Sequence, residues 1–254
     1  MGAVGVMLAS AVLLAMASGP FRAFADSDLC GQAIVLLQIG MSIWSGAVMI
    51  GRFGQLKDLQ ARSERFVDDF ASKDDPLHLY YNAYQFDDSA MENVYRKTAE
   101  RLVKLIPQSQ LILLRQDANT RLSLTPVLME LVETTCVHTT DEETMKLGKG
   151  MTVLAVITSS APLLGLFGTV WGVMLAFQAM AASGSANIAE LAPGISSALL
   201  TTVVGLVVAI PSTIAYNTLH AKIEAYTVQL EGFAEELMGK LSLHYGAHER
   251  GGAC

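Results

Sequence analysis

The hydroxyl side chains with the greatest potential for chemistry lie in a nearly charge-free part of the chain. Between Met151 and Leu219 the only charged residue is Glu190. Proton relays inside membranes generally use Asp, Glu or His, and none of these lies in the middle of either apolar half of this run. If protons cross this protein, the titrating carboxylate must therefore come from another chain, with Thr169 and Thr202 supplying hydroxyl donors and acceptors around it.

Small residues accompany these threonines at helical spacing. In the first half of the run the small face consists of Gly165, Gly168, Thr169, Gly172 and Ala176. In the second half Ser197, Thr201, Gly205 and Ala209 recur every four residues, with Ala198 and Thr202 beside them. Such faces allow helices to pack closely, and they also suit contact with a partner helix or the lining of a lumen. In a lumen, Thr201 and Ser197 are expected to join Thr169 and Thr202 in the ion pathway. Spacing alone favours ordinary packing, because a threonine hydroxyl can bond to a carbonyl one turn earlier in its own helix.

The apolar segments predict an all-α integral membrane protein. The chain has 254 residues, of which 52% are hydrophobic and 16% charged. Residues 33–50 form a further uncharged stretch long enough to approach the roughly 20 residues that cross a bilayer. We expect transmembrane helices at 31–51, 151–180 and 191–219, an outer N-terminal segment at 1–30, a cytoplasmic helical loop at 52–150, a periplasmic hairpin at 181–190 and a cytoplasmic helical tail at 220–254.

Charge placement predicts the orientation of these spans. Of the 17 Lys and Arg residues, thirteen lie between residues 51 and 150. The positive-inside rule places this loop in the cytoplasm, the N-terminus outside and the C-terminus inside. Residues 3–17 are apolar and precede Ala23-Phe-Ala25, so the first 25 residues are either a cleaved signal or, by preference, a helix at the outer membrane face.

The loop and the tail are predicted to be helical. Apolar residues continue at helical period beyond Arg52, and Thr125-Pro126 is typical of a helix start. A helical stretch is expected from Ser89 to Asn119, with a break or kink at Pro107. A narrow apolar seam follows in the tail, at Ile223, Tyr226, Leu230, Phe233 and Leu237. We expect this seam to pack on the loop helices of its own chain or of a neighbouring subunit.

Several kinds of chemistry are not expected. There is no phosphate loop, no GxSxG elbow and no HExxH pair, so neither an enzyme nor a bound cofactor is predicted. The three cysteines and the His244/His248 pair lack the spacing of a metal site. The net charge of −7 argues against a nucleic-acid surface.

At this point the residues resemble a known family. Pro162-Leu-Leu-Gly-Leu-Phe-Gly-Thr-Val-Trp-Gly-Val-Met174, Ala192-Pro-Gly-Ile195 and Ala209-Ile-Pro, followed by Ala215-Tyr-Asn217, are similar to the signature of the MotA/TolQ/ExbB proton-channel family, in its TolQ/ExbB branch. The resemblance implies a homopentamer in the bacterial inner membrane that surrounds ExbD/TolR-like single-span subunits, each with one membrane aspartate. It further implies that proton-motive force energises a TonB- or TolA-like transducer, and that Thr169 and Thr202 are the pore threonines.

One departure from the family pattern keeps alternatives open. Where the branch usually has Ala-Glu, this chain has Ser196-Ser197. This change is compatible with a divergent lineage, a different partner contact or altered conduction. The alternatives to a proton-driven motor subunit are a structural membrane scaffold that conducts no ion and a flagellar-type, MotA-like stator, which predicts a fourth span made from residues 3–17.

Overall fold

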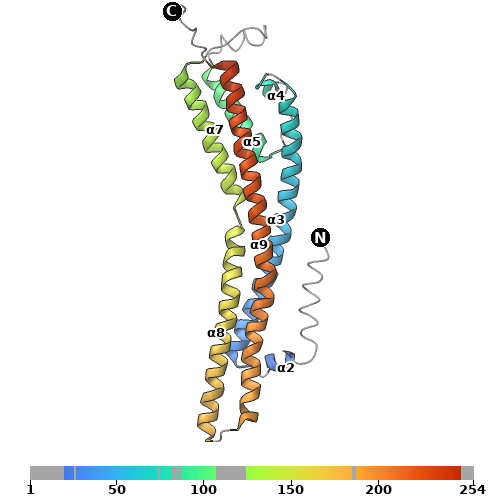
Figure 1. The fold of residues 1–254 in the computed structure, drawn as a ribbon, viewed down its shortest axis with the longest axis vertical. Helices are drawn as coiled ribbons and strands as arrows, with labels where there is room; N and C mark the ends of the chain where they lie inside the picture. Colours follow the sequence, from blue (N-terminus) through green and yellow to red (C-terminus); the bar gives the residue numbers. More distant parts are fainter. Residues whose placement is uncertain are drawn as a thin grey trace, which may run out of the picture. The chain divides into compact units, whose positions relative to one another are not determined.

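The chain folds into long helices, three of which have the length and apolar character to cross a membrane (Figure 1). The computed structural model describes residues 20–25, 27–73, 75–81, 84, 87–106, 124–184 and 187–246. Its helices are α2 (Pro20–Ala25), α3 (Leu29–Ala71), α4 (His78–Tyr81), α5 (Ala90–Leu105), α7 (Pro126–Leu147), α8 (Met151–Ser183) and α9 (Ile188–Tyr245). The three membrane-capable helices are α3, α8 and α9. The expected all-α membrane architecture is therefore present, while the limits of the membrane-embedded parts stay predictions.

These helices form two compact units. Unit 1 comprises Met1–Phe53 and Gly150–His220, and unit 2 comprises Gly54–Lys149 and Ala221–Cys254. Both α3 and α9 contribute to each unit, because each helix is continuous through the residue at which the units divide. The continuation of α3 beyond Arg52, predicted from its periodicity, is thus confirmed.

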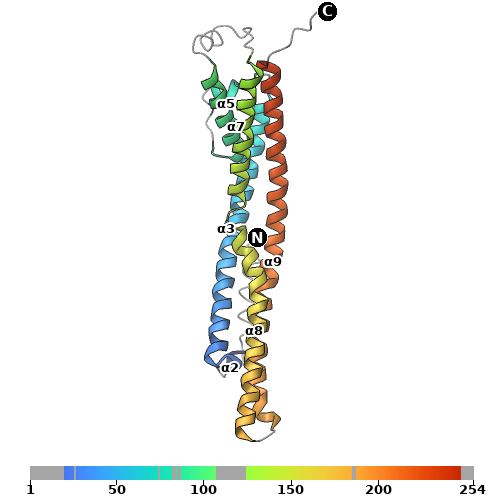
Figure 2. The ribbon, with the colours of Figure 1, turned by 90° about the vertical axis from the view of Figure 1, so that its left-hand side faces the viewer.

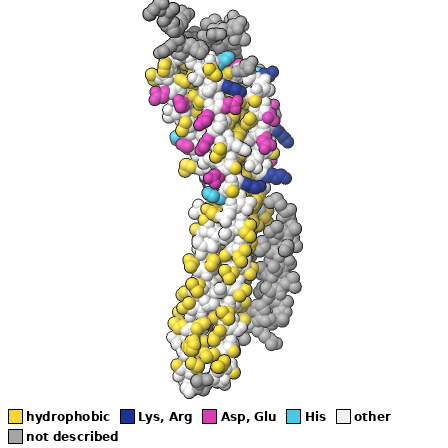
Figure 3. Space-filling view, viewed as in Figure 1, with side chains coloured by type: hydrophobic (Ala, Val, Ile, Leu, Met, Phe, Trp, Pro, Cys, Tyr) yellow, Lys and Arg dark blue, Asp and Glu magenta, His cyan; other side chains and the backbone are white. Residues whose placement is uncertain are grey.

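Unit 1 contains the first part of α3, all of α8 and the first part of α9, which run side by side in both ribbon views (Figures 1 and 2). The Asp28 carboxylate begins α3 by accepting from the backbone N–H groups of Cys30 and Gly31 at 3.2 and 3.1 Å. Gly150 begins α8 with φ +83°, a left-handed conformation that suits glycine. On the face shown in Figure 3 the side chains of this unit are largely hydrophobic. Such a surface is suited to lipid or to other apolar helices.

Unit 2 is built around a separate aromatic and aliphatic core. Phe66 packs edge to face against Tyr95 and Phe233, with ring centroids 5.6 and 5.8 Å apart. The core includes Phe66 and Phe70 from α3, Val94, Tyr95 and Leu102 from α5, Val132 and Cys136 from α7, and Tyr226, Leu230, Phe233, Leu237 and Leu241 from α9. Tyr226, Leu230, Phe233 and Leu237 of the tail seam therefore pack on loop helices of their own chain.

The loop helices α5 and α7 begin at the positions expected from the sequence. The N-cap of α5 is Ser89, whose hydroxyl accepts from Glu92 N at 3.3 Å while the Glu92 carboxylate accepts from Ser89 N at 3.0 Å. Proline occupies the first position of α7, after Thr125. The part of the predicted 89–119 stretch beyond Ile106, with its Pro107 break, lies outside the described residues, as do residues 3–17 of the N-terminal segment.

Candidate ion-pathway and helix-packing site

The glycines of α8 lie directly against α9 of the same chain. A methyl group added at Gly168 would lie 2.7 Å from Thr201 Cβ, and one added at Gly172 would lie 2.7 Å from Ala198 Cβ. At Gly165 it would lie 2.9 Å from Thr202 Cα. These separations are too short for real carbon atoms, so the glycine stripe brings the two helix backbones together within one protomer.

The α9 side of this contact contributes Gly205 and Ala209. A methyl group at Gly205 would lie 2.6 Å from the Ala161 carbonyl oxygen of α8. Ala209 is 5% exposed and belongs to a small apolar cluster that also contains Ala161. The predicted small residues of both helices thus meet one another, and close packing inside the chain accounts for their positions.

Two of the predicted pathway threonines converge on one carbonyl group. The Thr202 hydroxyl donates to the Gly165 carbonyl oxygen at 2.8 Å. The Thr201 hydroxyl lies 3.1 Å from the same oxygen and 2.7 Å from the Ala198 carbonyl oxygen. A hydroxyl pair aimed at a carbonyl, in a stretch of α8 and α9 without acidic residues, is a polar position that can donate and accept hydrogen bonds. It contains no group that can carry a charge, so any proton carrier there must be supplied from elsewhere.

Thr169 and Ser197 are bonded within their own helices. The half-buried Thr169 donates to the Leu166 carbonyl oxygen at 2.7 Å, and Ser197 donates to the Gly194 carbonyl oxygen at 3.0 Å. Neither hydroxyl joins the Thr201–Thr202–Gly165 cluster through a hydrogen bond among the described residues. The structure therefore joins two of the four predicted pathway hydroxyls and leaves two satisfied locally.

Two polar residues of α3 were missed by the sequence reasoning. Gln38 is fully buried, and its amide nitrogen donates to the Ala161 carbonyl oxygen at 3.3 Å. Ser45 lies about two helical turns after Gln38, and its Oγ is 2.7 Å from Ser212 Oγ of α9. Since Ser212 already donates to the Val208 carbonyl oxygen at 2.8 Å, Ser45 is the donor in this pair. A glutamine within an otherwise apolar span was the available signal for Gln38.

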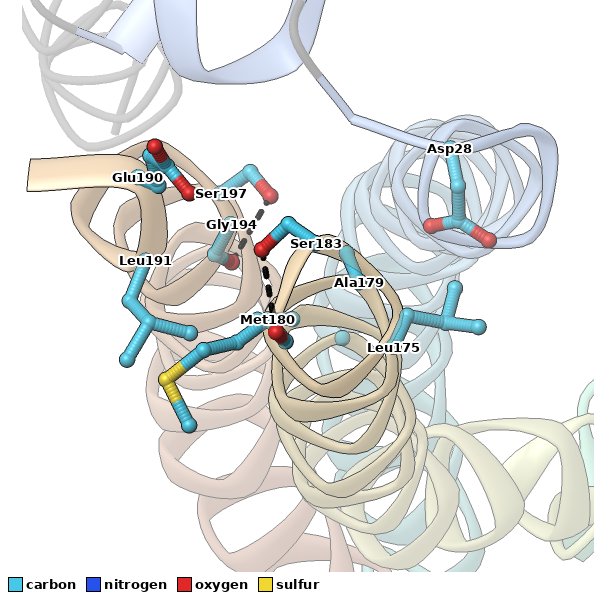
Figure 4. Close-up of a pocket in the computed structure, with 11 residues that line it drawn as sticks. Asp28, Leu175, Ala179, Met180, Ser183, Glu190, Leu191, Gly194 and Ser197 are labelled. Atoms are coloured by element: carbon cyan, nitrogen blue, oxygen red, sulfur yellow. Dashed lines mark hydrogen bonds between the residues drawn. The ribbon is translucent and has the colours of Figure 1, made fainter. Parts of the chain in front are cut away.

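A cavity of about 260 Å³ lies at the end of unit 1 near the α8–α9 connection (Figure 4). Its polar lining comes from Asp28, Ser183, Glu190 and Ser197. In Figure 4 Glu190 comes from α9 and Asp28 from the start of α3, with α8 residues between the two. The Asp28 carboxylate also accepts from Trp171 Nε1 at 2.9 Å, which ties α8 to the start of α3. Within the described ranges no three His, Cys, Asp or Glu residues come together as a metal site.

Comparisons with known proteins identify the family to which this helical arrangement belongs. Residues 109–232 match the sequence model described as the MotA/TolQ/ExbB proton channel family. The chain is 30% identical over 218 residues to the Tol-Pal system protein TolQ of Pseudomonas aeruginosa, covering 85% of this chain and 89% of that protein. TolQ of Haemophilus influenzae is 29% identical over 218 residues, covering 84% of this chain and 89% of its own.

A shorter region is more similar to a second kind of relative. Over 92 residues the chain is 44% identical to the biopolymer transport protein ExbB of Pseudomonas putida, which covers 36% of this chain and 28% of that protein. The matches support an inner-membrane protein that acts as a channel or motor subunit rather than as a conventional enzyme. This chain belongs to the MotA/TolQ/ExbB proton channel family, in its TolQ/ExbB branch.

Proposed function

We propose that this protein is the proton-channel subunit of an inner-membrane motor that uses proton-motive force to do work on the cell envelope. The observation that carries the proposal is the convergence of Thr201 and Thr202 on the Gly165 carbonyl oxygen, in a helix pair without an acidic residue beside it. The family membership supports the channel chemistry. The pathway then consists of Thr169, Thr202, Thr201 and Ser197, and the proton carrier is a carboxylate of a second protein.

The working assembly is a homopentamer around ExbD/TolR-like single-span subunits, each with a membrane Asp. Support comes from the outward apolar side chains of α8, such as Leu163, Leu166 and Val170, which are 65%, 57% and 63% exposed in the single chain. Neighbouring subunits, partner helices and lipid are the surroundings that such side chains require in a membrane. Proton transfer to the partner's Asp drives movement of one set of subunits relative to the other, and a TonB- or TolA-like transducer receives the work.

The orientation of the protein follows from charge. We expect the N-terminus and the α8–α9 connection outside, and unit 2 together with the C-terminus in the cytoplasm. Unit 2 holds most of the Lys and Arg residues of the chain, and positive charge is retained on the cytoplasmic side.

The experiment that tests the pathway measures proton flux in liposomes containing the complex of this protein with its single-span partner. Thr202→Ala removes the hydroxyl bonded to Gly165 and is expected to lower flux about tenfold, the equivalent of one hydrogen bond. Thr218→Ala is its matched control, because Thr218 donates only to the Ile214 carbonyl of its own helix at 2.8 Å. Thr169→Ala has Thr158→Ala as its matched control. Thr158 also lies on α8, and its hydroxyl donates to the Ala155 carbonyl oxygen of the same helix at 2.8 Å.

A non-conducting scaffold is the competing function, and one observation favours it. All of the predicted small residues and hydroxyls already have packing or hydrogen-bonding partners inside the chain. A scaffold predicts no flux above empty liposomes for the wild-type complex and equal assembly of all four variants. Flux that falls only in Thr169→Ala and Thr202→Ala supports the channel; unchanged flux in both removes these residues from the pathway.

A further inference from the structure

The amide of Gln38 lies where α3 meets the glycines of α8 and α9. Gln38 is fully buried, and it lies about 14 Å along α3 from Leu29, near the middle of a hydrocarbon layer of about 30 Å. Its nitrogen donates to the Ala161 carbonyl oxygen at 3.3 Å. A methyl group added at Gly205 would lie 2.9 Å from this nitrogen, and one added at Gly165 would lie 3.5 Å away. The two glycines therefore make room for a polar group in the apolar part of the molecule.

The oxygen of the same amide has no hydrogen-bond partner among the described residues. Exchanging the amide nitrogen and oxygen would not correct this, because the oxygen would then face the Ala161 carbonyl oxygen and neither could donate. A buried acceptor that has left water without finding a donor is costly, and such groups in native proteins are almost always paired. The Gln38 oxygen therefore requires a donor other than the side chains of the described residues.

The neighbouring hydroxyls do not supply that donor. Thr201 and Thr202, which pack against Gly165, already donate to backbone carbonyl oxygens. A side chain of another subunit would have to pass between the packed helices α3, α8 and α9 to reach the fully buried Gln38. Water is the donor small enough to enter by local opening of the helices, and it can bridge two or more polar atoms once inside.

We infer that Gln38 Oε1 is a binding site for a single buried water molecule at the junction of α3, α8 and α9. This inference rests on the proposed function for its role: Gln38 bonds to Ala161, one helical turn before the Gly165 carbonyl that receives Thr201 and Thr202. The water adds a mobile donor and acceptor next to hydroxyls that are otherwise bonded to carbonyls. Gln38 therefore holds a water molecule beside the proton pathway and does not itself take up or release a proton.

The water site is tested directly on the wild-type complex by water-edited solid-state NMR. The protein is prepared with fully 13C,15N-labelled glutamine and 15N-labelled isoleucine, because Gln38-Ile39 is the only Gln-Ile pair in the sequence and identifies Gln38 unambiguously. Magnetisation transfer from water to the Gln38 side-chain amide is expected. Its absence, while the combined signal of the other glutamine amides, which include the exposed Gln229, shows transfer, overturns the inference. This measurement requires no variant to fold and no flux to be observed.

The role in conduction is tested by Gln38→Met, which keeps the length of the side chain but removes the amide. Flux of the complex is expected to fall about tenfold, the equivalent of one hydrogen bond. Ser45→Ala is the matched control, because it also removes a buried hydrogen bond between α3 and α9, while Ser212 keeps its own bond to the Val208 carbonyl oxygen. An equal fall in both variants shows a packing role and overturns the inference. If the wild-type complex itself does not conduct, the proposed function fails, and the NMR result still decides the water site.

Discussion

At the scale of single residues, the buried tyrosines of unit 2 make its stability sensitive to alkaline pH. Tyr226 is fully buried and its hydroxyl lies 2.6 Å from Ser63 Oγ. Burial raises the pKa of Tyr226 to about 12. Burial also raises the pKa of Tyr95 and of Tyr245 above the usual value for tyrosine. In each case the folded protein favours the neutral phenol.

The sign of this shift predicts loss of stability between pH 10 and 12. An unfolded tyrosine titrates near pH 10, so below that pH both states are neutral and the stabilisation is fully present. As the pH rises towards the folded pKa, the unfolded state releases its proton first and the folded state loses up to about 1.4 kcal/mol per pH unit for each such tyrosine. Thermal unfolding followed by circular dichroism at pH 9, 10, 11 and 12 measures this slope.

The variant Tyr226→Phe isolates the contribution of one phenol. At neutral pH it is expected to cost about 1 kcal/mol, because Ser63 loses its partner. Its unfolding temperature should then decline less between pH 10 and 12 than that of the wild type. Tyr80→Phe, at a half-buried position, serves as the control for the loss of a phenol hydroxyl. If stability declined equally with pH in the wild type and in Tyr226→Phe, the Tyr226 phenol would ionise as readily in the folded protein as in the unfolded protein.

At the scale of helices, the contact between α8 and α9 depends on the absence of side chains at a few positions. At Gly168 an added methyl group would meet both Cβ and Cγ2 of Thr201, at 2.7 and 2.9 Å. Since Thr201 is 1% exposed, it has little room to move aside. The two helix backbones must separate to accommodate any larger residue.

Gly168→Ala is therefore expected to destabilise the protein by about 1–3 kcal/mol, the usual cost of overpacking a tight interface. Gly46→Ala on α3 is the matched control, because a methyl group there would meet nothing within 4 Å. The midpoint of thermal unfolding in detergent compares the two variants. A Gly168→Ala protein as stable as Gly46→Ala would contradict the close approach of α8 and α9.

The start of α5 provides a second test at the scale of helices. Ser89→Ala removes the hydroxyl that accepts from Glu92 N and is expected to cost about 1 kcal/mol. Hydrogen exchange of the first turn of α5 should accelerate more than exchange in α7, because the loss is local. Ser72→Ala, which removes an exposed hydroxyl bonded to Asp69 O at 2.8 Å, should leave α5 unchanged. Uniform acceleration of both helices would instead indicate that the cap is needed for the whole of unit 2.

At the scale of the whole molecule, the distribution of charge separates the two units. In Figure 3 the acidic and basic side chains gather over α7, α9 and neighbouring segments of unit 2, whereas those of unit 1 on the same face are mainly hydrophobic or uncharged. An apolar unit suits hydrocarbon and a charged unit suits water. This division supports the proposed topology, with the α8–α9 connection and unit 2 on opposite sides of the membrane.

Single cysteines introduced at Asn187 and Val228 test that topology. Asn187 lies at the start of α9, and Val228 is 63% exposed in unit 2. In spheroplasts of a strain carrying the protein without its native cysteines, a membrane-impermeant maleimide should label Asn187→Cys at once and Val228→Cys only after permeabilisation. The reverse pattern would invert the orientation derived from the positive residues.

Helix existence, the starts of the loop helices and membrane character were predictable from the sequence because they depend on local properties. Apolar length predicts a span, a proline after Thr125 predicts the start of α7, and the 3-4 spacing of Tyr226, Leu230 and Phe233 predicts a packed face. The family was also recognisable, because its motifs are continuous in the sequence and lie on α8 and α9.

Only the tertiary structure decided which groups meet across helices. Periodicity placed Gly165 and Thr202 on faces made of small residues. It could not show that these two faces contact each other, because the contact depends on how α8 and α9 cross, and the crossing depends on residues far apart in the chain. For the same reason the tail seam could pack on its own loop or on a neighbour, and the fold shows the first. Gln38 passed unnoticed as one amide in an apolar span; its burial against Ala161 and Gly205 arises from the packing of three separate helices.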